Sequence, residues 1–507
     1  MFWNHVKVAL RNLRKNKLFA TINIVGLAIG LSIYVFGGLL VKYERTHDMF
    51  FENASRIYTV GSTAAPGLNV GIDKINSTFS AVGPIIETEL REDVDAVART
   101  INSEYLISVG QESFYEGILF ADPALLDIFD FNYLHGDASA LRDPSGLVIT
   151  ESMADKYFGR TDVIGEVFTF DNEYDFHVAA VIEDVPLNSH FASSVIIEGT
   201  ISFLVPMQGF NRMRDWDLAG DWNNLSVGNM TYVMLREGMG EEWLAERLDD
   251  IYGRLVPEDQ HEVISSLTVT PLAHANLAVW DMIGMPVIAV VSLLSLLVLV
   301  VACVNYTNLA TAQSLGRSRE VGMRKTMGAS QRQLLGQFLV ESLVITAIAM
   351  VVAIAALELI IPLLNSAANK ALRINYLETL PWLIITTAVV GLLAGAYPAW
   401  LITRATPIEA LRDSARKGKK GSRMRAVMIG VQFAISAFML AIVSVVYMQN
   451  DKVKESSYVF PRSEIYTLGR LGIDGVRERL DTLKYELEDL PNVDSVSFSW
   501  QVPYEQN

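Results

Sequence analysis

Long apolar runs divide the chain into a few large pieces. The first run, Leu18–Val41, has 24 residues and no charged side chain. A helix of this length, rising about 1.5 Å per residue, would be roughly 36 Å long and could cross a hydrocarbon core of about 30 Å. No small-residue cleavage site follows it, so we interpret it as a span rather than a signal peptide. Four later runs predict four further spans: Val287–Ala312, Phe338–Leu364, Leu380–Ile402 and Val427–Met448.

The stretch of about 240 residues between the first two spans has the patterns of a folded domain. Gly146–Thr150 is typical of a buried strand, and the next residues predict a helix that Thr150 caps and Gly159 ends. Apolar and polar residues alternate in residues 176–182, which predicts a strand with one buried face. Apolar residues at helical spacing in residues 241–256 predict a helix with one apolar stripe. The strand face is Phe176, Val178, Ala180 and Ile182, and the stripe is Trp243, Leu244, Leu248, Ile251 and Leu255. These elements predict an α+β domain in which the stripe packs on the domain's own sheet rather than on a partner helix.

Composition and charge agree with a membrane protein and predict its orientation. The chain is 51% hydrophobic, with a mean hydropathy of +0.28. The net charge of −16 hides an asymmetry, because lysine and arginine gather in residues 1–20, 313–333 and 403–425, where acidic residues are few. Basic segments next to spans stay in the cytoplasm. All three lie on one side if the spans are as predicted, so residues 43–283 and the tail from 449 are expected outside.

Motifs of known chemistry are absent from the sequence. The one cysteine, Cys303, lies in an apolar run, which excludes an internal disulfide. None of the seven histidines falls in H-E-x-x-H or a similar metal spacing, and there is no G-x-S-x-G nucleophile motif. There is also no G-x-x-x-x-G-K-[ST], so the chain itself is not expected to be an ATPase. We therefore predict no catalytic, cofactor-binding or metal site in this chain.

The polar segment between the second and third spans, about residues 317–330, is longer than a simple turn requires. It reads "SREVGMRKTMGAS" from Ser318, and Gly316 and Gly328 bracket a stretch that can form about three helical turns. The positive charges alone could be a topology signal. Topology would not require the apolar residues Val321, Met323 and Met327, which predict a contact with an apolar socket on a partner.

Small residues four apart occur in two spans. Gly26 and Gly30 form one such pair, and Gly391 and Gly395 form the other. These patterns permit close helix approach, either within the chain or at a dimer seam. Glu341 and Glu358 lie toward the ends of the third span, where we expect water to reach them.

A short repeat suggests a duplicated unit. Ser55–Val60 ("SRIYTV") and Ser463–Leu468 ("SEIYTL") each follow a basic segment, a long apolar span and a polar linker. The tail then predicts a helix followed by a strand. We expect a second external domain that begins here, and a natural chain that continues beyond Asn507 with three more spans.

These residues resemble the FtsX-like ABC-transporter permeases with a MacB-type periplasmic core domain, and the likeness spans essentially the whole chain. The motifs are "RNLRKNKLFATINIVGLAIG", "RTHDMFFENASRIYTV", "FADPALLDIFDFNYLHGDASALRDPSGLVITESMADKYFG", "VAAVIEDVPLNSHF", "REVGMRKTMGASQRQLLGQFLVES" and "GLLAGAYPAWLITRATPIEALR". The resemblance implies an α-helical polytopic membrane protein with an α+β extracytoplasmic domain of the MacB type and a repeated span–domain architecture whose second half is incomplete. It also implies that the polar segment is a coupling helix seated in a cleft of the ATPase. The docking residues would be Arg319, Glu320, Val321, Gly322, Met323, Arg324, Lys325, Met327 and Gly328.

The expected domain boundaries follow from the spans. They are a basic cytoplasmic N-terminus 1–17, a first span 18–42, an extracytoplasmic core domain 43–283, an FtsX-like permease domain 284–402, a basic cytoplasmic loop 403–425, a fifth span 426–448 and the start of a second extracytoplasmic domain 449–507.

The expected function is that of a non-catalytic permease subunit in a bacterial inner membrane, multi-pass, with a cytoplasmic N-terminus. ATP and Mg²⁺ would bind a separate ABC ATPase subunit, and this chain would hold no cofactor. Expected partners are that ATPase, a second or homologous permease, the lipid bilayer, and a periplasmic adaptor or substrate protein, but no nucleic acid. The tasks left open are peptide or drug export, lipoprotein release and mechanical signalling. The alternatives are a membrane-anchored sensor or regulatory subunit with an extracytoplasmic ligand-binding domain, and an anchored hydrolase.

Overall fold

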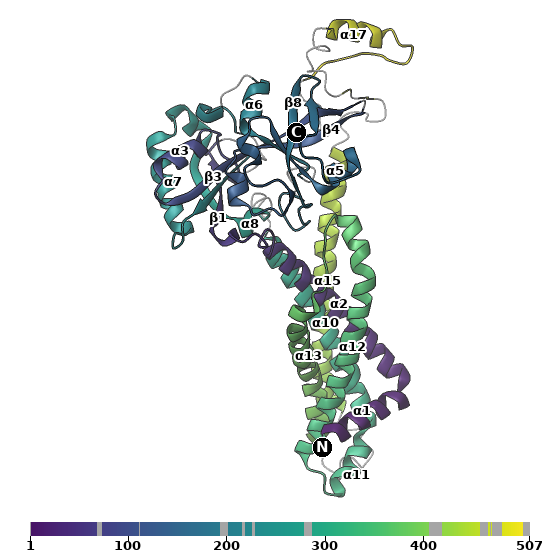
Figure 1. Cartoon of the computed structure of the whole chain (residues 1–507). Helices are drawn as coiled ribbons and strands as arrows, with labels where there is room; N and C mark the ends of the chain where they lie inside the picture. Colours follow the sequence, from purple (N-terminus) through teal and green to yellow (C-terminus); the bar gives the residue numbers. More distant parts are fainter. Residues whose placement is uncertain are drawn as a thin grey trace. The chain divides into compact units, whose positions relative to one another are not determined.

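The computed structural model describes residues 2–67, 74–110, 112–192, 201–214, 218–225, 229–277, 286–404, 418–456, 465–466, 468 and 479–499. Within it the chain divides into two compact units, Met1–Gln432 and Phe433–Asn507. The first unit contains a helical bundle and a sheet domain (Figure 1).

Five helices among the described residues are long and apolar enough to span a membrane. They contain the segments Lys17–Arg45, Val287–Gln313, Gln331–Ala368, Tyr376–Arg404 and Arg423–Lys452. All five predicted spans are therefore present as helices. The first four lie in the first unit, in α2 (Lys17–Arg45), α10 (Val287–Gly316), α12 (Gln331–Ala368) and α13 (Tyr376–Arg404), and the fifth lies in α15 (Gly418–Ser456).

The bundle of α2, α10, α12 and α13 is closely packed where small residues meet. Its core contains Leu31 and Val35 of α2 beside Ala349 and Ala353 of α12, each 0% exposed. Gly30 lies directly against Ala302, and Gly395 against Ser342, so a side chain at either glycine would collide with the neighbouring helix. Gly391 meets Leu343 in the same way, whereas an added Cβ at Gly26 would lie 3.6 Å from its nearest neighbour, an ordinary contact. These glycines pack inside the chain.

Two short helices lie where the spans leave the bundle. α1 (Phe2–Lys15) is separated from α2 at Asn16 and contacts α12. α11 (Ser318–Thr326) follows α10 after Arg317. Gly328, in the left-handed region at φ +93°, turns the chain, and Ser330 then caps α12 in a reciprocal pair with Gln333.

The sheet domain is built on one sheet with eleven described strands. The order is β11-β1-β10-β3-β4-β9-β6-β8-β5, with β2 on β1 and with β7 pairing β3 and β8. Most neighbours are antiparallel, but β4–β9 and β6–β8 are parallel. The strands are β1 (Ile57–Ala64), β2 (Lys74–Ile75), β3 (Val94–Val109), β4 (Glu112–Ala121), β5 (Tyr133–His135), β6 (Gly146–Thr150), β7 (Val167–Phe170), β8 (Tyr174–Ile182), β9 (Phe203–Pro206), β10 (Met230–Leu235) and β11 (Ile264–Pro271).

Helices pack against this sheet. They are α3 (Val82–Glu89), α4 (Leu125–Ile128), α5 (Glu151–Phe158), α6 (Met207–Arg214), α7 (Glu241–Leu255) and α8 (Leu272–Ala275). Two of them, α5 and α7, are the ones that the sequence predicts. Leu244, Leu248 and Ile251 of α7 are buried against the sheet, in one cluster with Val60 and Val233. The helical stripe therefore packs on its own domain, and the domain is α+β as predicted.

One detail of the predicted helix after Thr150 differs from the prediction. α5 begins after Thr150 and ends at left-handed Gly159, but the Thr150 hydroxyl does not cap it. The carboxylate of Asp184 accepts from the Ser152 amide instead, at 3.1 Å, so a distant loop satisfies this helix end.

The second unit differs from expectation in its strand. α17 (Leu480–Glu488) is the predicted tail helix, but residues 491–499 form no strand. A strand needs a neighbour for its backbone groups, and the described residues of this unit include no other strand. Most of the second repeat motif, Ser463–Leu468, lies outside the described residues.

Candidate coupling site

α11 lies at the end of the bundle remote from the sheet domain, because α10 runs the length of the bundle between the two (Figure 1). Its two faces differ. Val321 is 1% exposed and packs against Leu334 of α12 and Ile402 of α13. Val321 was expected to meet a partner, and its burial corrects that expectation: the side chain fixes α11 to its own bundle.

The outer face of α11 exposes its methionines. Met323 is 54% exposed and Met327 is 76% exposed, although both are large apolar side chains. Arg319 and Gly328 are exposed beside them, whereas Gly322 is buried. Exposed flexible methionines are well suited to an adaptable apolar contact, because their side chains repack at little energetic cost.

The basic residues of α11 contact its own chain. Arg324 donates to Gln337 Oε1 at 2.6 Å and forms an ion pair with Glu320, also at 2.6 Å. Lys325 Nζ donates to the carbonyl of Thr403 at 2.6 Å. These contacts attach α11 to α12 and α13. Arg324, Lys325 and Glu320 thus position the helix, and their expected contact with a partner stays a prediction.

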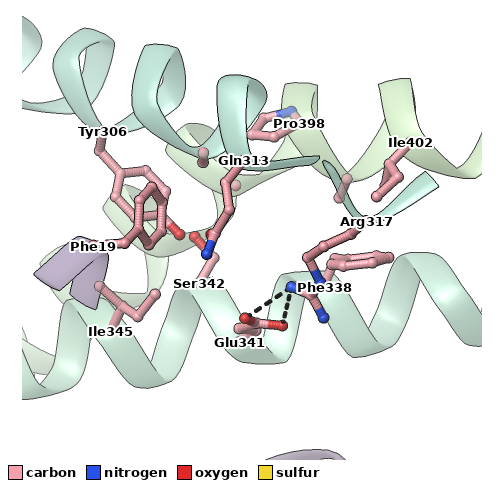
Figure 2. A pocket seen from close by; sticks show the side chains of 13 residues that line it. Phe19, Tyr306, Gln313, Arg317, Phe338, Glu341, Ser342, Ile345, Pro398 and Ile402 are labelled. Carbon is pink, nitrogen blue, oxygen red and sulfur yellow. Dashed lines mark hydrogen bonds and ion pairs between the residues drawn. The ribbon is translucent and has the colours of Figure 1, made fainter. Parts of the chain in front are cut away.

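The junction between α10 and α11 is held by an ion pair that the sequence analysis did not identify. Arg317 Nη1 contacts both carboxylate oxygens of Glu341, at 3.0 and 3.1 Å, and the two side chains are only 15% and 13% exposed (Figure 2). The Arg317 guanidinium also lies 4.8 Å from the ring centre of Phe338, and Asn12 of α1 donates to Glu341 at 3.4 Å. Removing one member of such a pair leaves an uncompensated charge in a poorly solvated place.

A small cavity of about 40 Å³ adjoins this ion pair. Phe19 of α2, Tyr306 and Gln313 of α10 and Ser342 of α12 line it (Figure 2). Pro398 and Ile402 of α13 line it as well, so four spans converge beside the residue that leads into α11. The signal for this site was Glu341 itself, because a carboxylate within a span needs a basic partner. Sequence alone could not say which arginine that partner is.

A second polar cluster joins α2 to the sheet domain at the other end of the bundle. Asp48 is completely buried, and its backbone is in the left-handed region at φ +60°. Its carboxylate accepts from the hydroxyl of Ser189 at 2.5 Å and lies 3.1 Å from Nδ1 of His47 and 2.9 Å from Nδ1 of His190. His190 Nε2 then lies 2.7 Å from the hydroxyl of Tyr232. Two motifs of the predicted family, "RTHD" and "NSHF", thus meet at one point.

The electrostatics of this cluster favour a charged Asp48. Burial by itself would raise the pKa of Asp48, but the charge and hydrogen bonds of His190 and His47 outweigh burial and hold that pKa below its ordinary value. Burial and the nearby Asp48 raise the pKa of Tyr232 well above its ordinary value. Ser189 donates to the carboxylate rather than to an imidazole, and all five side chains of the cluster are at least nine-tenths buried. The cluster therefore has the geometry of a structural joint and not of a nucleophile.

Further contacts tie the last turns of α2 to three other segments. The Tyr43 hydroxyl donates to the Leu187 carbonyl at 2.7 Å. Glu44 forms an ion pair with Lys370 at 2.7 Å and accepts from Asn276 at 2.9 Å. The end of α2 is thus attached to the loop after β8, to the segment after α8 and to the α12–α13 connection.

Two family descriptions match the chain. "MacB-like periplasmic core domain" matches residues 20–251, and "FtsX-like permease C-terminal" matches residues 292–407. The second range includes α11 and the Arg317–Glu341 pair, and the first includes the Asp48 cluster.

Known proteins that resemble this chain are permeases. The uncharacterized ABC transporter permease YknZ of Bacillus subtilis (strain 168) is 23% identical over 441 residues, which cover 80% of this chain and 98% of the relative. The macrolide export ATP-binding/permease protein MacB of Syntrophobacter fumaroxidans is 31% identical over 116 residues, which cover 22% of this chain and 16% of that protein. Among solved structures, the periplasmic region of MacB from Actinobacillus actinomycetemcomitans is 12% identical, with a TM-score of 0.32 over 45% of this chain and 94% of that one.

Proposed function

This chain belongs to the FtsX-like ABC-transporter permeases with a MacB-like periplasmic core domain, and we propose that it acts as the membrane subunit of a transporter whose ATPase is a separate polypeptide. The ATPase docks on the outer face of α11. Met323 and Met327 enter its apolar cleft, while Val321, Arg324 and Lys325 hold α11 to the bundle.

The observation that carries this proposal is the contrast between the two faces of α11. One face is fixed to α12 and α13 through Val321, Arg324 and Lys325, and the other exposes two methionines. A helix that only separated two spans would need neither feature. A partner that pushes on Met323 and Met327 would therefore move α12 and α13 with α11.

The sheet domain lies outside the cytoplasm in this proposal, in a bacterial inner membrane, and α1 and α11 lie inside. The basic residues of the segments around Lys7, Arg317 and Arg423 support that orientation. ATP and Mg²⁺ bind the partner chain, and a second permease completes the assembly.

Movement of α11 reaches the sheet domain through α2 and its buried Asp48 joint. The named relatives leave the task open among export of a peptide or drug, lipoprotein release and mechanical signalling.

Co-purification with a candidate ABC ATPase subunit, expressed together with this chain, tests the proposal. Replacing Met323 and Met327 by aspartate should abolish the association, because two charges would lose their water in an apolar cleft. The matched control is Gln331→Asp, an exposed change at the start of α12 that should leave the association intact. Full binding and stimulated ATP hydrolysis by the double variant would contradict docking at α11. The basic segment 403–425 would then be the next candidate.

A further inference from the structure

A groove opens between three spans at the end of the bundle next to the sheet domain. It has a volume of about 450 Å³, within the range of about 300–1,000 Å³ usual for ligand pockets. The last turns of α2 and the first turns of α10 and α13 form its walls. Its lining is Tyr34, Gly37, Gly38, Leu39, Val41, Lys42, Ser292, Ser295, Leu296, Glu378, Thr379 and Trp382.

The body of the groove suits an apolar occupant. Its serine and threonine hydroxyls donate to nearby backbone carbonyls: Ser292 to Ile288 at 2.7 Å, Ser295 to Ser292 at 3.0 Å, and Thr379 to Asn375. These hydroxyls therefore attract water less than free ones would. A hollow of this size beside lipid is filled by hydrocarbon more readily than by water, because water there would lose hydrogen bonds.

Glycines and aromatic rings give the groove its shape. Gly38 lies beneath the Trp382 indole, where an added Cβ would approach the ring to 2.7 Å, and Gly37 meets Ser295 equally closely. The Trp382 ring stacks on Tyr34 with centroids 5.5 Å apart. Aromatic side chains of this kind are typical of the depth where hydrocarbon meets lipid headgroups.

The mouth of the groove holds two opposite charges. Lys42 and Glu378 form an ion pair, with side chains 46% and 58% exposed, and Asn375 donates to Glu378 at 2.6 Å. Such an exposed pair contributes little stability, so a ligand that supplies both charges can replace it. A cation beside an anion complements a headgroup that carries both signs. An anionic headgroup would meet the repulsion of Glu378.

We propose that this groove binds a zwitterionic phospholipid of the leaflet on the domain side. One acyl chain occupies the groove beside Leu296 and Trp382. The lipid phosphate pairs with Lys42 and the ammonium group with Glu378. The site lies far from α11, and binding requires only that the helices span a bilayer, so it stands apart from the proposed ATPase coupling.

Mass spectrometry of retained lipid tests this site. The full chain is reconstituted in vesicles of equal parts phosphatidylethanolamine and phosphatidylglycerol, extracted in detergent and washed. The wild type should keep a stoichiometric phosphatidylethanolamine. Ser292→Trp, which fills the groove from an exposed wall position, should lose it. The neighbouring Leu293→Trp should keep it, because Leu293 is 53% exposed but does not line the groove.

A headgroup variant tests the charges without filling the groove. Glu378→Gln removes the repulsion of anionic lipid and leaves Lys42, so retention should shift from phosphatidylethanolamine to phosphatidylglycerol. The proposal is overturned if the wild type keeps no stoichiometric lipid, which includes the case in which α15 fills the groove. It is also overturned if Ser292→Trp retains as much lipid as Leu293→Trp, or if Glu378→Gln leaves the headgroup preference unchanged.

Discussion

Arg317 and Glu341 form the most consequential pair at the scale of single residues. They connect the start of α11 to α12 in a place where both side chains are more than four-fifths buried. Loss of Arg317 leaves the Glu341 charge without its basic partner, whereas loss of Glu341 leaves Arg317 beside Glu320, at 3.4 Å. Loss of both removes the buried pair. Variants of the two residues therefore test whether the side chains are in direct contact, and not the effect of net charge.

Arg317→Gln should lower the free energy of unfolding by about 3 kcal/mol, because Glu341 would lose its compensating charge. The change is measured by thermal unfolding of the full chain in detergent. Glu341→Gln should cost less, because Arg317 keeps Glu320 as a partner, and the double variant should cost clearly less than the sum of the two single changes. Additive losses in this cycle would contradict a direct interaction.

Asp48 gives a pH dependence with a defined sign. Its pKa in the folded protein is held below its value in the unfolded chain, about 3.9. The contribution of Asp48 to the stability of the folded protein is therefore fully present above about pH 4. It is lost as the pH falls through the lower pKa of the folded state. Asp48→Asn should lower the unfolding temperature at pH 7, and the gap to the wild type should narrow only below about pH 4. If the difference in unfolding temperature between Asp48→Asn and the wild type disappeared between pH 7 and pH 5, the stabilisation would come from another group.

Part of these two sites was predictable from the sequence. The motifs around Asp48 and His190 were recognised separately. Glu341 was expected to lie where water reaches it, but its side chain is 13% exposed and pairs with Arg317. Ser189 is 141 positions from Asp48, however, and no local pattern indicates that the two meet. The sequence also did not show which face of α11 packs on the bundle. Val321 and Met323 are both apolar, and only tertiary contacts decide which of them is buried.

The packing of whole elements depends on a few small residues. The spans were predictable because long apolar runs with few charges are typical of membrane-spanning helices. Their neighbours were not, since small residues four apart fit either a seam within the chain or a dimer seam. The absent cap at Thr150 and the missing strand after α17 have a similar cause, because each depends on a partner from a distant segment.

Gly30→Val should disrupt the contact between α2 and α10, because the glycine already touches Ala302. Gly26→Ala, one turn earlier, should be tolerated, since its added Cβ would lie 3.6 Å from the nearest atom. The readout is the monodisperse fraction in size-exclusion chromatography after detergent extraction, with the unfolding temperature as a second measure. Equal behaviour of the two variants would mean that α2 does not pack on α10 as described.

At the scale of the whole molecule, the orientation of the chain in the membrane decides whether an ATPase in the cytoplasm can reach α11. A reporter that is active only outside the cytoplasm should be active when fused after Asp137, in the sheet domain. Fused after Gln331 or after Lys419, it should be silent, because these positions belong to basic segments that remain inside. Activity at Gln331 would place α11 out of reach of any ATPase.

The central claim is that force applied at α11 reaches the sheet domain through the bundle. The direct measurement is hydrogen exchange of the backbone amides of residues 46–51 and 188–192, around the Asp48 joint, in the complex with its ATPase. We predict that ATP changes exchange at these amides in the wild type. In Arg317→Gln, with the ATPase still bound, the ATP response at the joint should be lost. No ATP response in the wild type, or the same response in the variant, would contradict the claim.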